Sequence, residues 1–252
     1  MPLDLTVVIP AFNEETRLTP AVADVLAFAR RRDLDFELVV VDDGSRDGTA
    51  ELVRRLSQEA PELRLIRLAA NQGKGYAVRT GMVNARGRLV LFADADGATP
   101  AEEYDRLERA IVAGADVAIG SRALKTSEVL VRARWHRRVF GRVFHWLVEH
   151  LAVKGIQDTQ CGFKLFRGEV AHDLFSRMRM SGFSFDVEVL LMAQRRGYRV
   201  AEVPVNWHHV PGSRINLVTD SARMARDLFL IRANATRGLY DQPHVTPAVV
   251  PS

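Results

Sequence analysis

The chain has 252 residues, 47% of them hydrophobic and 26% charged, which is the composition of a soluble globular domain with a substantial core. Its formal net charge of +4 is too small for a dedicated nucleic-acid binder and favours phosphates, nucleotides or an anionic membrane surface as partners. The single cysteine excludes an internal disulfide, and no apolar run is long enough to cross a bilayer.

The first half of the chain alternates short apolar runs with segments whose apolar residues recur at helical spacing. This alternation predicts a mainly parallel α/β sheet with helices on both faces, because parallel strands need crossover connections. The predicted strands cover residues 5–9, 36–41, 63–68, 88–93 and 117–120. The predicted helices cover residues 16–32, 47–60, 74–85 and 100–113.

The second half is less regular. Residues 134–151 form an amphipathic pattern, with aromatic and aliphatic residues on one side and arginines, a histidine and a glutamate on the other. The segment 158–164 (Asp-Thr-Gln-Cys-Gly-Phe-Lys) is too polar for a buried strand. Further predicted elements are a helix over 185–196, a strand over 200–207 and a last helix from Thr219 toward Gly238. The proline-containing tail is predicted to be disordered.

Polar residues and glycines follow each predicted strand, at the edge where such sheets bind ligands. The sharpest example is Asp94-Ala95-Asp96, directly after the fourth strand. Two carboxylates that converge there would offer hard oxygen ligands to Mg²⁺ or Mn²⁺ bridged to a diphosphate. An Asp-x-Asp turn can also simply cap the next helix, but its place beside other ligand-like turns favours a metal site.

Two neighbouring turns offer groups for the rest of a nucleotide. A carboxylate of Asp42 or Asp43 can accept a hydrogen bond from the N–H of uracil or guanine, or from a ribose hydroxyl. The alternative is a plain strand–turn–helix connection. The segment 71–75 (Asn-Gln-Gly-Lys-Gly) offers helix N-terminal N–H groups and Lys74 to a phosphate or sugar, without the spacing of a Walker A motif.

Arginines, histidines and the cysteine outside these turns carry weaker signals. Arg122 and Arg214 each follow Gly-Ser and are candidates for binding phosphate, although most of the 35 basic residues must be solvated surface charges. Adjacent residues on a strand face opposite sides, so His208 and His209 do not form a chelating pair, and a structural or acceptor-binding role is expected. Cys161 is expected to pack in the core.

Three segments together resemble the family 2 glycosyltransferases: residues 8–15 (Val-Ile-Pro-Ala-Phe-Asn-Glu-Glu), 40–49 (Val-Val-Asp-Asp-Gly-Ser-Arg-Asp-Gly-Thr) and 92–96 (Phe-Ala-Asp-Ala-Asp). Within that family the chain is similar to the dolichyl- or polyprenyl-phosphate sugar synthases up to about residue 237. Segments 71–75, 94–99 and 158–166 resemble the glucose-transferring branch of these synthases.

The resemblance implies a GT-A (Rossmann-like) fold and an inverting transfer of glucose from UDP-glucose to a polyprenyl phosphate. It implies one domain over residues 1–240, with 1–125 binding the nucleotide sugar and 126–240 the acceptor, followed by a disordered tail over 241–252. The residues it assigns to the donor base and ribose are Pro10, Phe12, Glu14 and Asp42 or Asp43. The residues it assigns to the metal are Asp94 and Asp96, and to phosphates Arg122 and Arg214. Ala98 stands where some mannose-transferring relatives have a glutamine ligand.

The acceptor side is expected to contain Asp158, Gln160 and Lys164, with Lys164 as a ligand of the acceptor phosphate. An ionised phosphate needs positioning more than a base. If the acceptor were a hydroxyl, a carboxylate would have to act as base, with Asp158 as the first candidate and Asp186 as the second. Alternatives are a related transferase that uses GDP-mannose or a soluble acceptor, and a nucleotide-sugar-binding module without turnover.

The relation to the membrane is the last expectation. Acidic Asp4 before the first apolar run argues against a signal peptide, and a cytoplasmic protein without a membrane anchor is expected. Residues 134–151 and the helix after Asp220 would then dock on the cytoplasmic face of the bilayer, with basic residues against anionic headgroups. The alternative is that these helices cover the protein's own core.

Overall fold

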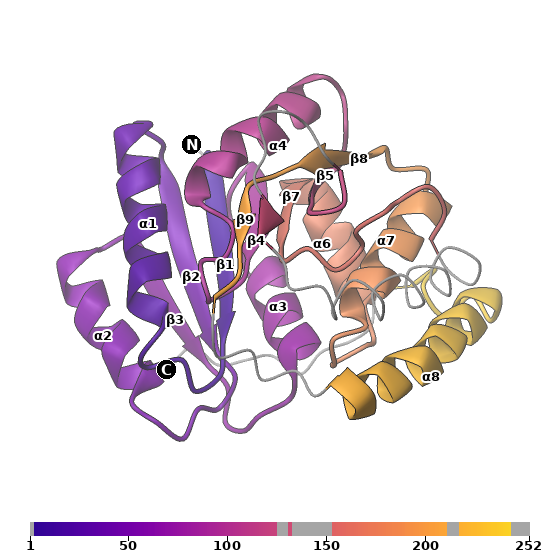
Figure 1. Ribbon diagram of the computed structural model, residues 1–252, viewed down its shortest axis with the longest axis horizontal. Helices are drawn as coiled ribbons and strands as arrows, with labels where there is room; N and C mark the ends of the chain where they lie inside the picture. Colours follow the sequence, from indigo (N-terminus) through magenta and orange to yellow (C-terminus); the bar gives the residue numbers. More distant parts are fainter. Residues whose placement is uncertain (1–2, 125–130, 133–152, 211–216, 243–252) are drawn as a thin grey trace.

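A seven-stranded sheet lies between two layers of helices in the computed structural model, which describes residues 3–124, 131–132, 153–210 and 217–242 (Figure 1). The strand order is β3-β2-β1-β4-β7-β5-β8. The strands are β1 (Leu5–Ala11), β2 (Phe36–Asp42), β3 (Leu63–Arg67), β4 (Leu89–Ala93), β5 (Val117–Ser121), β7 (Phe163–Arg167) and β8 (Val200–Pro204). All neighbours pair in parallel except β7, which runs antiparallel to both β4 and β5.

The parallel part of the sheet confirms the five strands predicted from the first half of the sequence. Every residue of β1 and β2 is buried, as expected for strands that are covered by helices on both faces. Successive side chains enter opposite cores, so Val8 packs with one helical layer and Ile9 with the other.

Strand β7 corrects the expectation that segment 158–164 is too polar for a buried strand. Phe163 and Lys164 begin this central strand and are both 2% exposed. Lys164 can occupy a core position because the carboxylate of Asp186 lies 2.5 Å from its Nζ. A buried charge is tolerated when it is paired in this way. Its partner is 22 residues away in the sequence, so the local pattern could not reveal it.

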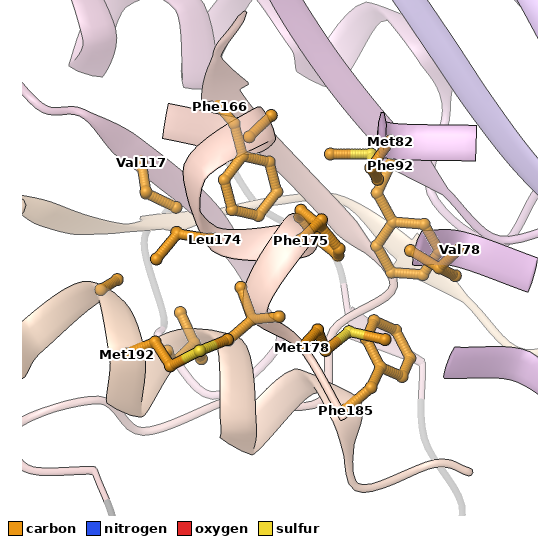
Figure 2. Packing of buried hydrophobic residues seen from close by; sticks show 14 of the residues in the cluster. Val78, Met82, Phe92, Val117, Phe166, Leu174, Phe175, Met178, Phe185 and Met192 are labelled. Atoms are coloured by element: carbon orange, nitrogen blue, oxygen red, sulfur yellow. The ribbon is translucent and has the colours of Figure 1, made fainter. Parts of the chain in front are cut away.

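The helices divide between the two faces (Figure 1). One face is covered by α1 (Leu18–Arg31), α2 (Thr49–Glu59) and α4 (Tyr104–Val112), the last preceded by a 3-10 turn over Ala101–Glu103. The other face is covered by α3 (Lys74–Val83), α6 (Gly168–Arg177), α7 (Phe185–Arg195) and α8 (Leu217–Thr236). Figure 2 shows the core on this second face, where Phe166 and Phe175 meet edge to face with ring centroids 5.4 Å apart.

The predicted strand over residues 200–207 is divided in the structure. Strand β8 ends at Pro204, and β9 (Trp207–His208) leaves the sheet to pair in parallel with β6 (Val131–Arg132). The predicted amphipathic helix over 134–151, Arg214 and the tail from residue 243 lie outside the described residues. Among the helices that the structure describes, none is both long enough and apolar enough to span a membrane.

Candidate active site

The loops that follow β1 and β2 are joined by hydrogen bonds into one rim at the carboxyl end of the sheet. The N–H of Asn13 donates to Ser45 Oγ at 2.8 Å, and the N–H of Arg46 donates to Asn13 Oδ1 at 2.8 Å. Asn13 holds a left-handed backbone conformation with φ 54°, which asparagine tolerates better than most residues. Nearby, the Glu14 carboxylate accepts two hydrogen bonds from the Arg17 guanidinium, at 2.8 and 2.6 Å. These contacts connect the two loops and fix the shape of the rim.

Three predicted donor residues lie on this rim or directly beneath it. Pro10 is buried near the end of β1, whereas Phe12 and Glu14 in the following loop are partly exposed. These positions agree with contact to a nucleoside, and that contact stays a prediction.

The paired aspartates after β2 are turned toward protein groups. Asp43 accepts hydrogen bonds from the N–H groups of Gln72 at 2.7 Å and Gly73 at 2.9 Å, and from Asn71 Nδ2 at 2.9 Å. Asp42 is fully buried and accepts the N–H of Ser45 at 3.0 Å. Burial raises the pKa of Asp43, but these hydrogen bonds favour its ionised form. Asp43 thus shapes the loop that leads into α3, a role that the sequence did not indicate.

The Asp94-Ala95-Asp96 turn directly follows β4 and is fixed by its neighbours. The N–H of Asp94 donates to the Gly162 carbonyl at 3.0 Å, and the N–H of Ala98 donates to Asp96 Oδ1 at 3.1 Å. The Asp94 carboxylate packs directly on Gly162, where a Cβ atom would lie only 2.0 Å from Asp94 Oδ2. Ala95 turns the other way into the core and is 7% exposed. Glycine at position 162 is what leaves room for the Asp94 side chain.

The two carboxylates of this turn interact electrostatically. Burial and the negative charge of Asp94 raise the pKa of Asp96, so additional positive charge beside the pair would stabilise its ionised form. The ammonium of Lys74 contacts this pair, with its Nζ 2.7 Å from Asp94 Oδ1. The carboxylate oxygens of such an acidic pair fit a hard divalent cation such as Mg²⁺ or Mn²⁺.

No set of three or more acidic, histidine or cysteine side chains is placed to hold a metal within residues 3–124, 131–132, 153–210 and 217–242. A cation on Asp94 and Asp96 would therefore complete its coordination with donor phosphates and water.

Arg122, just after β5, is oriented by three contacts. Its Nε and Nη2 donate to the two oxygens of Asp158 at 2.7 and 2.8 Å, which is a bidentate pair. Its guanidinium also lies 5.6 Å from the ring centroid of Trp207. The N–H of Asp158 in turn donates to Glu202 at 2.8 Å. The Arg122 side chain is 34% exposed, and its predicted contact with a phosphate stays a prediction.

Lys164 and Asp186 are bound to each other inside the protein. Lys164 Nζ contacts Asp186 and also donates to the Cys161 carbonyl at 2.5 Å, and both charged side chains are buried. The predicted roles of Lys164 as a phosphate ligand and of Asp186 as a candidate base stay predictions, and in the structure the charge of each side chain is paired with that of the other. Gln160 reaches toward α8, where its Nε2 lies 3.8 Å from Met224 Sδ. Cys161 is 1% exposed, and burial raises its pKa to about 12, so it is a packed thiol.

The sequence reasoning missed Gly162, Glu202 and Trp207. Each acts through a residue far away in the chain, and although Gly162 lies in a segment that carries the family resemblance, no role of its own was expected for it from the sequence. Of the histidine pair, His208 donates its backbone N–H to the Ala98 carbonyl at 3.0 Å, which ties β9 to the turn after β4. The imidazole of His209 lies beside Trp207, with ring centroids 6.3 Å apart.

Comparisons with known proteins agree with this architecture. Residues 6–175 match the model of "Glycosyl transferase family 2". Dolichyl-phosphate beta-glucosyltransferase of Drosophila melanogaster is 40% identical over 91% of this chain and 74% of its own length. The UDP complex of glucosyl-3-phosphoglycerate synthase from Mycobacterium tuberculosis superposes with a TM-score of 0.67 at 18% identity, over 96% of this chain and 82% of that one. The complex of that enzyme with Mn²⁺, UDP-glucose and phosphoglyceric acid gives a TM-score of 0.64 at 17% identity, over 96% and 81% of the chains.

The mixed sheet with acidic and basic side chains at its carboxyl edge is that of a GT-A glycosyltransferase. This chain belongs to glycosyl transferase family 2.

Substituting Gly162 with alanine tests the packing of the Asp94 carboxylate. The new methyl group must displace that carboxylate, so we expect Gly162→Ala to stay folded but to lose about 100-fold in sugar-transfer turnover. Gly182→Ala is the matched control, because nothing lies within 4 Å of a Cβ atom there. Circular dichroism and transfer rates would be compared, and equal turnover of the two variants would contradict the packing argument.

Proposed function

We propose that this protein transfers glucose from UDP-glucose to a polyprenyl phosphate with inversion at the anomeric carbon, and that the reaction depends on Mg²⁺ or Mn²⁺. The names of its relatives support the sugar and the class of acceptor. The Mn²⁺ and UDP-glucose in the complex of a protein with the same fold support the donor and the metal. The observation that carries the proposal is the placement of an acidic pair and a fixed arginine at one edge of the sheet.

On the donor side, the acidic turn and the loop before α3 would bind the diphosphate. A metal ion on Asp94 and Asp96 would neutralise the negative charge that grows on the departing UDP. Asp43 keeps the N–H groups of Gln72 and Gly73 turned inward and so holds the start of α3, with Lys74, beside the turn. The positive end of that helix also favours a phosphate.

On the acceptor side, an ionised phosphate oxygen would attack the anomeric carbon in line with the departing UDP. A new bond forms from that oxygen to the carbon, and the bond from the carbon to the β-phosphate oxygen breaks with its electron pair leaving on UDP. No proton has to be removed from the acceptor. Both oxygens of Asp158 already accept hydrogen bonds from Arg122, and Arg122 holds the pKa of Asp158 below its usual value although burial opposes this. These contacts favour a role of Asp158 in orienting Arg122 over a role as base.

A polyprenyl phosphate resides in a membrane, and α8 offers a surface that fits one. Phe229 is 62% exposed and Leu230 is 43% exposed. At about 100° per residue they share one side of α8 with the exposed Arg226, and the exposed Arg237 directly follows the end of the helix. Apolar residues between arginines match the boundary of a bilayer with anionic headgroups, and we propose peripheral docking through this side on the cytoplasmic face.

The direct test is incubation of the purified protein with UDP-glucose and polyprenyl phosphate, with and without EDTA. We expect glucosyl polyprenyl phosphate and UDP in equal amounts, and loss of both when EDTA removes the metal. GDP-mannose and a soluble sugar acceptor serve as competing substrates. Product from GDP-mannose alone, or product formation that EDTA leaves unchanged, would refute the proposed donor or the proposed metal dependence.

Docking through α8 is tested by replacing Phe229 and Leu230 together with serine. Because these side chains would bury apolar area in the bilayer, we expect at least about a tenfold loss of affinity for vesicles made of equal parts neutral and anionic phospholipid. Val112→Ser is the control, since Val112 is 82% exposed but lies on α4 in the other helical layer. Sedimentation with vesicles measures binding, and unchanged binding of the double variant would exclude this surface.

A further inference from the structure

The ammonium group of Lys74 lies on the carboxylate that is proposed to hold the metal. Lys74 Nζ is 2.7 Å from Asp94 Oδ1. It is flanked by the rings of Phe92 and Phe183, with centroids 5.5 and 5.8 Å away. The Lys74 side chain is 25% exposed, so one side of it faces the site. The ammonium is thus directed at Asp94 by two aromatic rings.

The backbone of Lys74 is held in place by the glycines on either side of it. Glycines at positions 73 and 75 let the first turn of α3 pack directly on the loop before α7. A Cβ atom on Gly73 would lie 2.5 Å from the Ser181 carbonyl oxygen, and one on Gly75 would lie 2.6 Å from that of Met180. Any movement of the ammonium must therefore come from rotation of the lysine side chain, without displacement of the helix.

A divalent cation and this ammonium compete for the same oxygen. Asp94 Oδ1 is buried and has no hydrogen bond besides the ion pair with Lys74. Two positive charges at one carboxylate oxygen repel each other, and the repulsion is stronger in partly buried surroundings of low effective dielectric than in water. A metal that binds to the free protein must therefore either tolerate the repulsion from the Lys74 ammonium or displace that ammonium from Asp94. A diphosphate that arrives with the metal gives the displaced ammonium a new partner.

We propose that Lys74 acts as an internal cation for the Asp94–Asp96 pair and offsets its negative charge in the free enzyme. When the donor diphosphate binds together with the metal, the ammonium of Lys74 moves from Asp94 to the diphosphate, and the metal takes its place on the two carboxylates. This inference rests on the proposed metal-dependent use of a nucleotide-diphosphate donor. Its consequence is positive coupling: Mn²⁺ alone binds weakly, and Mn²⁺ and UDP each strengthen binding of the other. Lys74 then serves both to hold off metal without donor and to bind the donor.

The test is Mn²⁺ binding to Lys74→Met, followed by the electron paramagnetic resonance signal of free Mn²⁺, with and without UDP. Methionine keeps an apolar side chain between the two rings but removes the charge. We expect Mn²⁺ alone to bind the variant at least about fivefold more tightly than wild type, because like-charge repulsion is gone. We expect UDP in the presence of Mn²⁺ to bind at least about fivefold more weakly, because the ammonium no longer meets the diphosphate.

Two other variants serve as controls. Lys154→Met removes an exposed lysine and should leave both affinities at the wild-type values. Lys74→Arg keeps the charge and should keep Mn²⁺ binding weak. If Lys74→Met fails to fold by circular dichroism, Lys74→Gln replaces it in the same measurements.

The outcomes separate this inference from the proposed function. Unchanged or weaker binding of Mn²⁺ alone to Lys74→Met overturns the competition, and unchanged UDP binding to that variant overturns the transfer of the ammonium to the diphosphate. In both cases metal-dependent UDP binding by the wild type would still stand. If instead the wild type binds no Mn²⁺ with or without UDP, the proposed metal site itself is refuted.

Discussion

The repulsion between two carboxylates held together at the end of β4 is the constraint on which the site depends. Asp94 cannot move away from Asp96, because its N–H is bound to Gly162 and its side chain packs on that glycine. Burial and the neighbouring charge both disfavour ionisation of Asp96. A cation relieves this cost, and Lys74 supplies one within the chain. These contacts hold two acids close together, which is the arrangement on which the proposed metal site rests.

The sheet supplies the rigidity that this arrangement needs. The central antiparallel strand β7 brings Gly162 beside the end of β4, because the residues just before the strand lie at that edge. The same segment carries Asp158, which fixes Arg122 at the end of β5. One short stretch of chain therefore positions both the acidic turn and the arginine. Groups fixed in advance interact strongly with charge that develops in a reaction, because they need no reorganisation.

The sequence was sufficient for the parts of the fold that depend on local pattern. The apolar runs of β1 to β5 and the Asp-x-Asp turn after β4 are contiguous signals, and the structure confirms the strands and the place of that turn. What could not be predicted depends on partners distant in the chain. The Lys164–Asp186 pair spans 22 residues and makes a lysine acceptable inside a strand. The Arg122–Asp158 pair spans 36 residues, so the local pattern could not show that both oxygens of Asp158 are bound by an arginine. Asp43 is a similar case, because its three hydrogen-bond donors lie beyond the next strand.

The most direct measurement of the central interaction is calorimetric titration of UDP into the protein with and without Mn²⁺, for the wild type and for Asp96→Asn, with the exposed Asp33→Asn as control. We predict that Mn²⁺ strengthens UDP binding to the wild type and the control by at least about tenfold, and that Asp96→Asn loses this gain because one carboxylate ligand is removed. UDP binding that does not respond to Mn²⁺, or an Asp96→Asn variant that responds as strongly as the wild type, would contradict a metal held by this pair of acids.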